Sequence, residues 1–377
     1  MSYFLSKGFI PILLGVLASY LIFPPVVISE YLIEYDFYSS FEFDFFHSSV
    51  SFAIFLLYLF AGILLKTRTP GLGSSRCSAN LKNLLLFSFY LFFIIYVLLK
   101  FDLIIYVLQH GIFSLSRTDS IELFADVFYS PYISYLFSFL LVNSFFLAKV
   151  DVKAPIICLF IFGVMLDAVF GARINFLRFI VVFVALFNLN RKGVTLVLLL
   201  FALLVFSRAL FSGYSASNIY DIIILGFGDQ VNIFLGQHLL LNATLNSCGI
   251  DGLHFIRSLI PPFMRGDLVD FYFPDVANIC MNKVGLIGYG GSPFSDLLFV
   301  PLSFLSSTLL LIFIYIFNIH YLRIGLLKVF LLILIISCLP YFLRNGHIST
   351  INYISTMYFW VFLPLFGLFS LFRKRFK

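Results

Sequence analysis

The sequence predicts an all-α polytopic integral membrane protein with about ten transmembrane helices, and three observations support this fold class. The chain of 377 residues is 62% hydrophobic and only 11% charged, and its mean hydropathy is +1.06. A soluble protein is about half apolar and about a quarter charged. The apolar runs reach the length of about 20 residues that crosses a bilayer. Basic residues gather in alternate connections between those runs. Only a bilayer could solvate so much apolar surface.

The apolar runs divide the chain, taken as one transmembrane domain over residues 1–377, into consecutive spans. We expect the first span to stay uncleaved, because Pro24 and Pro25 follow it and no small-residue cleavage site is evident. The longest connection lies between the seventh and eighth spans. The predicted spans cover residues 8–28, 50–65, 83–99 with an extension toward 107, 127–148, 154–170, 174–188, 194–211, 293–319, 324–343 and 351–372.

The distribution of charge predicts the orientation of these spans. The two termini and the connections after even-numbered spans hold 15 of the 24 basic residues but only one of the 18 acids, Asp151. Cytoplasmic loops are enriched in Lys and Arg, so we place both termini and these connections in the cytoplasm. Lys100 and Asp102 interrupt the third span, but splitting it there would reverse every later loop and abolish the charge bias.

Three substantial loops face the opposite, outer side in this topology. The first, residues 29–49, is acidic, and the second covers residues 109–126. The third, residues 212–291, is the large periplasmic loop; its apolar part is interrupted by polar residues and suits short interfacial helices. Cys248 and Cys280 both lie in it, and either a disulfide or two independent thiols would fit an oxidising compartment.

Arginines on the outer side are the strongest functional signal. The positive-inside rule predicts few basic residues there, and charge near lipid is costly, so such residues indicate a site. Arginine also grips phosphate with a planar fork of donors, which lysine lacks. We therefore expect an outward-facing pocket that holds a lipid-linked diphosphate. The arginines are Arg117, Arg173, Arg178, Arg208, Arg257, Arg265 and Arg344.

Several of these arginines allow two interpretations. Arg173 lies in the tight hairpin between the fifth and sixth spans, where it could bind phosphate or form an ion pair with Asp167. Arg178 lies about one turn inside the sixth span and could snorkel to the surface or face the bundle interior. Arg208 lies about 21 Å along the seventh span, in the outer part of a core about 30 Å thick. We favour an orientation toward the bundle for Arg208.

Candidates for acid–base chemistry accompany the arginines. His254 precedes Arg257 by three residues, so one helical turn would place both on one face. A histidine with a pKa near neutrality can take a proton from a sugar hydroxyl, although His254 could equally be a solvated loop residue. Glu42 and Asp44 form a carboxylate pair in the first outer loop, either a second candidate base or part of a plain acidic loop.

Other motifs add little. Residues 285–296, GLIGYGGSPFSD, lead into the eighth span, and their glycines could present backbone N–H groups to an anion. Arg344 and His347 close the ninth span as a lower-ranked basic pair. The sequence contains no Walker loop, no zinc-binding Cys/His pattern and no G-x-S-x-G elbow. We therefore expect no cytoplasmic nucleotide chemistry.

The layout resembles the O-antigen and capsule repeat-unit polymerases of the Wzy type over about residues 116–304. The resemblance rests on the Arg173 hairpin with the exit NRK (residues 190–192), on SRTD (residues 116–119), and on the large outer loop. That loop ends in GYGGS, residues 288–292, before a final group of spans. In the related O-antigen ligases the large loop carries a histidine with arginines, to which His254 and Arg257 look similar.

The resemblance implies a GT-C-like membrane glycosyltransferase of a bacterial inner membrane, with a periplasmic active site and without metal, nucleotide or other cofactor. Its substrates would be undecaprenyl-diphosphate-linked glycans, and the lipid bilayer would surround it. Its partners would be a chain-length regulator and a flippase, and it would bind no nucleic acid. A hydroxyl of the incoming repeat unit would attack the anomeric carbon of the growing chain. The diphosphate would be held by Arg173, Arg208, Arg257 and Arg265, with Arg117 and Arg178 behind them; His254 leads as base, with Glu42 and Asp44 as rivals.

Three other classes compete with this one. A lipid-linked oligosaccharide flippase would also need outward cations, but transporters usually show two similar halves and charges near the midplane, neither of which is evident. A membrane O-acyltransferase should carry a His-centred motif near its first spans, whereas the early His47 faces outward in the predicted topology. An O-antigen ligase performs closely related chemistry.

Overall fold

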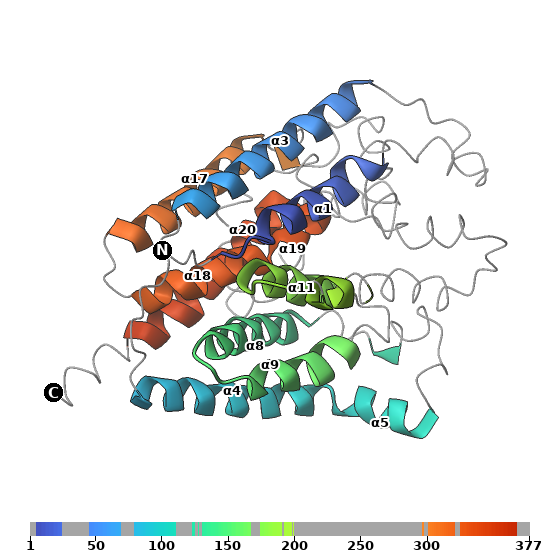
Figure 1. Ribbon diagram of the computed structural model, residues 1–377, viewed down its shortest axis with the longest axis vertical. Coiled ribbons are helices and arrows are strands. Elements are labelled where there is room, and N and C mark those ends of the chain that lie inside the picture. The colour runs from blue at the N-terminus through green and yellow to red at the C-terminus, as the bar shows by residue number, and fades with distance from the viewer. Residues whose placement is uncertain are drawn as a thin grey trace, which may run out of the picture. The chain divides into compact units, whose positions relative to one another are not determined.

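The computed structural model describes residues 5–24, 45–68, 79–110, 123–124, 127, 130–166, 174–190, 192–197, 199, 296–297, 301–320 and 325–367. All regular secondary structure in these residues is helical (Figure 1), in agreement with the predicted all-α class. Within them, α4 and α8 are long and apolar enough to cross a membrane, and the bent pair α18–α19 would make a third span. The total of about ten spans stays a prediction.

The chain forms two compact units. The first contains Met1–Ile12 and Leu64–Phe227, and the second contains Leu13–Ile63 and Gly228–Lys377. The helices of the first unit are α4 (Ala79–Leu99), α5 (Phe101–His110), α8 (Pro131–Lys149), α9 (Ala154–Leu159), the π-helix η2 (Phe160–Met165) and α11 (Ile174–Leu186). The second unit holds most of α1 (Phe9–Leu21) and α3 (Phe45–Arg68), with α17 (Pro301–His320), α18 (Gly325–Ser337), α19 (Leu339–Asn345), α20 (His347–Thr356) and the π-helix η6 (Met357–Phe362).

Helix α8 is the core helix of the first unit. It begins where Ser130 accepts a hydrogen bond from the Ile133 N–H and proline occupies the first turn, a favourable N-terminus. About 72% of its membrane-length window is buried, against 22% for α4. Helix α4 instead exposes large apolar side chains such as Phe87 (66% exposed) and Leu98 (62%). Such a face suits contact with lipid tails, so α8 is buried within the unit while α4 lies at its surface.

Helices α4 and α8 run antiparallel. The ring of Phe92 lies 5.0 Å from that of Phe139, and Tyr96, further along α4, contacts Phe137, which lies earlier in α8. A tight turn at Asp151, with a φ of 66°, then reverses the chain from α8 into α9. The N-terminal end of α4 and the start of α9 thus lie near the C-terminal end of α8.

The N-terminal segment and the C-terminal ends of α8 and α11 meet at this same end of the first unit. The Lys149 ammonium at the end of α8 donates to the Leu186 carbonyl at the end of α11. The Ser6 N–H donates to the Ala185 carbonyl at 2.7 Å, and the Lys7 N–H donates to Asn188 Oδ1 at 3.3 Å. The sequence predicts one membrane side for all these segments, and the structure brings them together at one end. Which compartment this end faces stays a prediction.

In the second unit, α18 and α19 pair antiparallel with α20 and η6. Phe330 in α18 packs against Phe362 at 5.5 Å and Phe366 at 5.0 Å between ring centres, while Tyr341 in α19 stacks on Tyr353 in α20 at 5.8 Å. The axis bends by 43° between α18 and α19, where Pro340 lies in the first turn of α19. The predicted ninth span is therefore a broken helix.

Candidate functional site

Arg178 is the one residue assigned to diphosphate or base that the structure describes, and Arg344 and His347, the lower-ranked basic pair, are described as well. The remaining predicted site residues, and the two loop cysteines, lie outside the described residues: Glu42, Asp44, Arg117, Arg173, Arg208, Cys248, His254, Arg257, Arg265 and Cys280. Two described regions nevertheless combine buried polar side chains in a way that apolar packing does not require. One surrounds Arg178 in the first unit, and the other surrounds the break between α19 and α20 in the second.

Arg178 faces the interior of the first unit. It lies in the first half of α11, its side chain is 0% exposed, and its Nη2 donates to the hydroxyl of Ser138 in α8. The guanidinium carbon also lies 5.3 Å from the ring centre of Phe137, which adds a cation–π contact. Of the two orientations open from the sequence, the structure has the inward one. Binding of diphosphate by Arg178 stays a prediction.

The Arg178 region belongs to a buried polar layer along α8. Ser138, Asn143 and Ser144 are each 0% exposed. The Asn143 amide donates to the Leu85 carbonyl at 3.0 Å and to the Ser88 hydroxyl at 3.2 Å, both in α4. Helix α8 thus makes polar bonds to α4 on one side and to α11 on the other. In an apolar bundle such bonds fix the mutual position of helices, because few alternative partners exist.

The second region is built on Gly346, which ends α19 and begins α20. Its φ of 89° and ψ of 167° are accessible almost only to glycine. A Cβ at this position would lie 2.6 Å from Asp296 Oδ2. Asp296 is 1% exposed, and its Oδ2 accepts a 2.9 Å hydrogen bond from the Ile348 N–H in the first turn of α20. A distant carboxylate therefore caps α20 and opposes the positive end of its dipole.

His347, the first residue of α20, is held by two hydroxyl groups. Tyr58 Oη in α3 lies 2.6 Å from Nδ1, and Thr308 Oγ1 in α17 lies 2.8 Å from Nε2. The single Thr308 hydroxyl proton is donated to the Phe304 carbonyl at 2.8 Å, so Thr308 Oγ1 accepts from Nε2–H. Nδ1 is then the acceptor for the Tyr58 hydroxyl. These contacts assign a neutral imidazole with its proton on Nε2.

The imidazole is also enclosed by aromatic rings. Phe304, Phe342 and Tyr58 lie 4.3, 5.5 and 6.1 Å from it between ring centres. His347 is 4% exposed and joins α3, α17 and α20 through its two ring nitrogens. In the geometry observed, both nitrogens are occupied, so the residue positions helices rather than presenting a free base.

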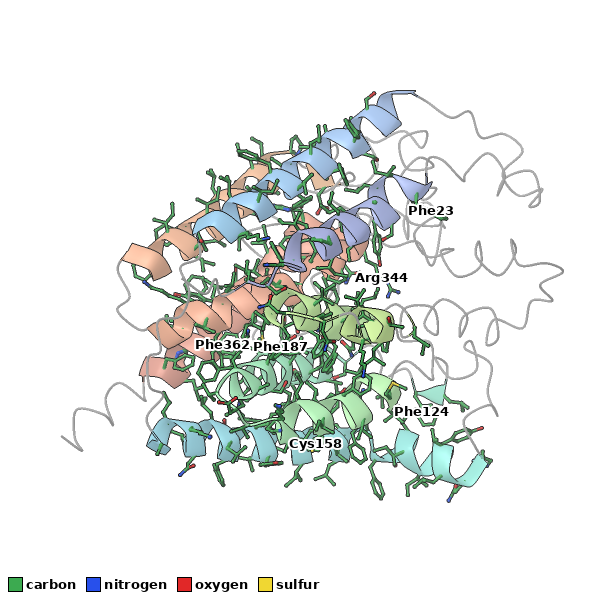
Figure 2. The ribbon with its side chains drawn as sticks, in the orientation of Figure 1. Phe23, Phe124, Cys158, Phe187, Arg344 and Phe362 are labelled. Atoms are coloured by element: carbon green, nitrogen blue, oxygen red, sulfur yellow. The ribbon has the colours of Figure 1, made fainter. Side chains whose placement is uncertain are left out.

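Sequence reasoning singled out His347 but missed its partners. It grouped His347 with Arg344, which Figure 2 labels near the end of α19, whereas the ring nitrogens of His347 bond to Tyr58 and Thr308. Tyr58 and Thr308 lie within apolar runs where nothing distinguishes them from membrane-facing residues. Asp296 had a visible signal, since it ends the glycine-rich segment of residues 285–296.

No cluster of three or more His, Cys, Asp or Glu side chains suited to a metal occurs among the residues that the structure describes. No protein-family model matches the chain, and neither a curated protein nor a solved structure matches it. The family that the sequence resembles therefore stays a prediction.

Proposed function

We propose that the protein is a membrane glycosyltransferase that polymerises undecaprenyl-diphosphate-linked oligosaccharide repeat units at the periplasmic face of a bacterial inner membrane. The observation that carries this proposal is the inward orientation of Arg178. An arginine inside a membrane bundle is expensive and by default indicates function. Arg178 adds an inward-facing example to the arginines that the sequence predicts on the outer side.

The proposed chemistry explains why arginines would dominate the site. The hydroxyl of an incoming repeat unit attacks the anomeric carbon of the growing chain, and the bond to the diphosphate lipid breaks. Negative charge gathers on the leaving diphosphate as that bond lengthens. Guanidinium groups around it stabilise the transition state more than the ground state, which lowers the barrier. Arg173, Arg208, Arg257 and Arg265 are the proposed ligands, and His254 is the proposed base.

The arrangement of the first unit supports the placement of this chemistry on the outer side. Lys7, Lys149 and the C-terminal end of α11 meet at one end, which the positive-inside rule predicts to be cytoplasmic. Helix α11 runs toward that end, so its start lies toward the opposite one. Arg178 lies in the first half of α11. Its guanidinium is therefore in the half of the helix nearer the predicted periplasmic face.

Deletion of the gene tests the proposal through the pattern of surface polysaccharide on a gel. Loss of polymerase activity should leave a single repeat unit attached to the lipid core. Arg173→Ala and Arg257→Ala should each reproduce this pattern at an unchanged protein level, while Arg→Lys should restore activity only in part because lysine lacks the fork. Normal ladders from both alanine variants would contradict the assigned roles.

Arg178 needs a separate control because it also holds helices together. Ser138→Ala removes the hydroxyl that accepts from Arg178 and leaves the guanidinium in place. If Arg178 acts on substrate, Arg178→Ala should abolish the ladder while Ser138→Ala, at a matched protein level, retains it. If Arg178→Ala retained the ladder as well as Ser138→Ala does, Arg178 would have no role in binding substrate.

A lipid-linked oligosaccharide flippase is the second candidate, and the broken helices of the second unit favour it. The chain bends by 43° between α18 and α19, and α20 begins anew at Gly346. Discontinuous helices with buried polar residues are typical of transporters. Deletion separates the two functions, since loss of a flippase should leave no glycan at the surface.

A further inference from the structure

Helix α20 combines polar composition with almost complete burial. Seven of its ten residues, in the sequence HISTINYIST, carry polar side chains, yet only Ser349 and Tyr353 are not fully buried. A helix that is polar on most sides normally meets water. Buried polar residues within a membrane bundle instead mark ligand or ion sites when their groups lack protein partners.

One face of α20 meets this condition. Ser355 and Thr356 follow Asn352 by three and four residues, so the three side chains are neighbours on the helix surface. They are 3%, 1% and 5% exposed for Asn352, Ser355 and Thr356. Asn352 Oδ1, Ser355 Oγ and Thr356 Oγ1 each have no hydrogen-bond partner. Three buried oxygens within one turn are therefore left without compensation.

Other hydroxyls of the same unit show that this is not the ordinary state of a serine or threonine in a helix. Thr350, in the same helix, donates to the Gly346 carbonyl at 2.8 Å. Ser337 in α18 donates to the Leu334 carbonyl at 2.8 Å. This bond to the preceding turn is the common solution for a buried hydroxyl. Ser355 and Thr356 do not bond to the preceding turn, so their oxygens remain available to a ligand.

The chemistry of the three oxygens suggests the occupant. An amide carbonyl and two hydroxyls are hard, neutral oxygen ligands, which suit a hard cation. Divalent cations usually require carboxylates among their ligands, whereas this set contains none. The cluster lies in the second half of α20, and the helix continues from there through η6 to residue 367. The rare π-helix η6 starts directly after Thr356, and such segments are frequent at functional sites.

We propose that Asn352, Ser355 and Thr356 form a binding site for a small monovalent cation, with sodium as the cation to test. The cation would supply the positive partner that each oxygen lacks, and any remaining ligands would be water or backbone carbonyls. The site is independent of the proposed glycosyl transfer, since it uses none of the residues assigned to diphosphate or to the base. It could serve either an enzyme or a transporter.

Binding of ²²Na⁺ to the purified full-length protein in detergent is the direct test. The wild-type protein should bind sodium saturably, and unlabelled Na⁺ or Li⁺ should displace the label while choline should not. Thr356→Val removes one ligand without changing side-chain volume much, and should weaken binding about tenfold or more. Thr350→Val is the matched control, because it makes the same change on the same helix at a hydroxyl that already has a partner.

Thermal unfolding gives a second readout that does not need the label. At constant ionic strength, NaCl should raise the Tm of wild-type protein and of Thr350→Val above that in choline chloride, and should not raise that of Thr356→Val. Absence of saturable ²²Na⁺ binding by the wild-type protein would overturn the proposal. This result does not depend on whether the variants fold. Equal sodium affinity in Thr356→Val, Ser355→Ala and the Thr350→Val control would overturn it as well.

Discussion

Gly346→Ala should be among the most damaging small substitutions in the second unit. Two effects act at this position. The φ of 89° is strained for any residue with a Cβ, which costs about 1–3 kcal/mol. The new methyl carbon would also lie 2.6 Å from Asp296 Oδ2, so the carboxylate would have to move away from the Ile348 N–H. Loss of a hydrogen bond to a charged group costs about 1.5–3 kcal/mol.

Together these effects predict a loss of about 2–5 kcal/mol in the free energy of unfolding, because the two contributions overlap. Equilibrium unfolding in mixed micelles containing SDS would measure it, with fluorescence from Trp360, the one tryptophan of the chain. Gly15→Ala is the matched control. A Cβ at Gly15 meets nothing within 4 Å, and alanine in an exposed helix is favoured over glycine by about 0.5–1 kcal/mol.

A double-mutant cycle separates the two effects. In an Asp296→Ala background the steric conflict disappears, so Gly346→Ala should then cost only the backbone strain of about 1–3 kcal/mol. The difference between the two backgrounds measures the clash with the carboxylate. If Gly346→Ala proved as harmless as Gly15→Ala, the geometry described for the junction of α19 and α20 would be wrong.

Two further substitutions test the polar contacts within each unit. Asn143→Leu should lower the free energy of unfolding by about 1–3 kcal/mol in the same assay, because the Leu85 carbonyl and the Ser88 hydroxyl each lose a donor; Ser144→Ala, which loses only a bond to its own helix, should cost less. Tyr58→Phe should cost about 0.5–1.5 kcal/mol through loss of the 2.6 Å bond to His347, and a stability equal to wild type would contradict a stabilising role for this bond.

The helical class and the positions of several helices were accessible from sequence, because they depend on local properties. Apolar runs and polar interruptions predict α8 and α11 closely: residues 127–148 and 174–188 were expected, and Pro131–Lys149 and Ile174–Leu186 are observed. The third predicted span is divided in the structure into α4 and α5 at Lys100, which is buried and lies over the ring of Tyr96 at 4.6 Å. The interrupting charge therefore marked a real break between two helices.

The polar contacts were not accessible in the same way, because they depend on which helices become neighbours. Nothing local distinguishes Tyr58 from other tyrosines of an aromatic-rich chain, and its role follows only from the proximity of His347. Asn143 likewise stands in an apolar run, and its function as a clamp follows from the antiparallel packing of α4. The arginines predicted to lie on the outer side show the converse case, since charge against the positive-inside trend is visible without a fold.

The junction of the N-terminal segment with α11 has a consequence for biogenesis. The Ser6 N–H and hydroxyl bond to the Ala185 and Val184 carbonyls, across 178 or more positions of chain. A segment that precedes α11 by almost 180 residues thus completes the terminus of that helix. Its hydrogen bonds can form only after α11 has been synthesised, so replacing Ser6 should slow maturation of the whole first unit rather than affect the N-terminal segment alone.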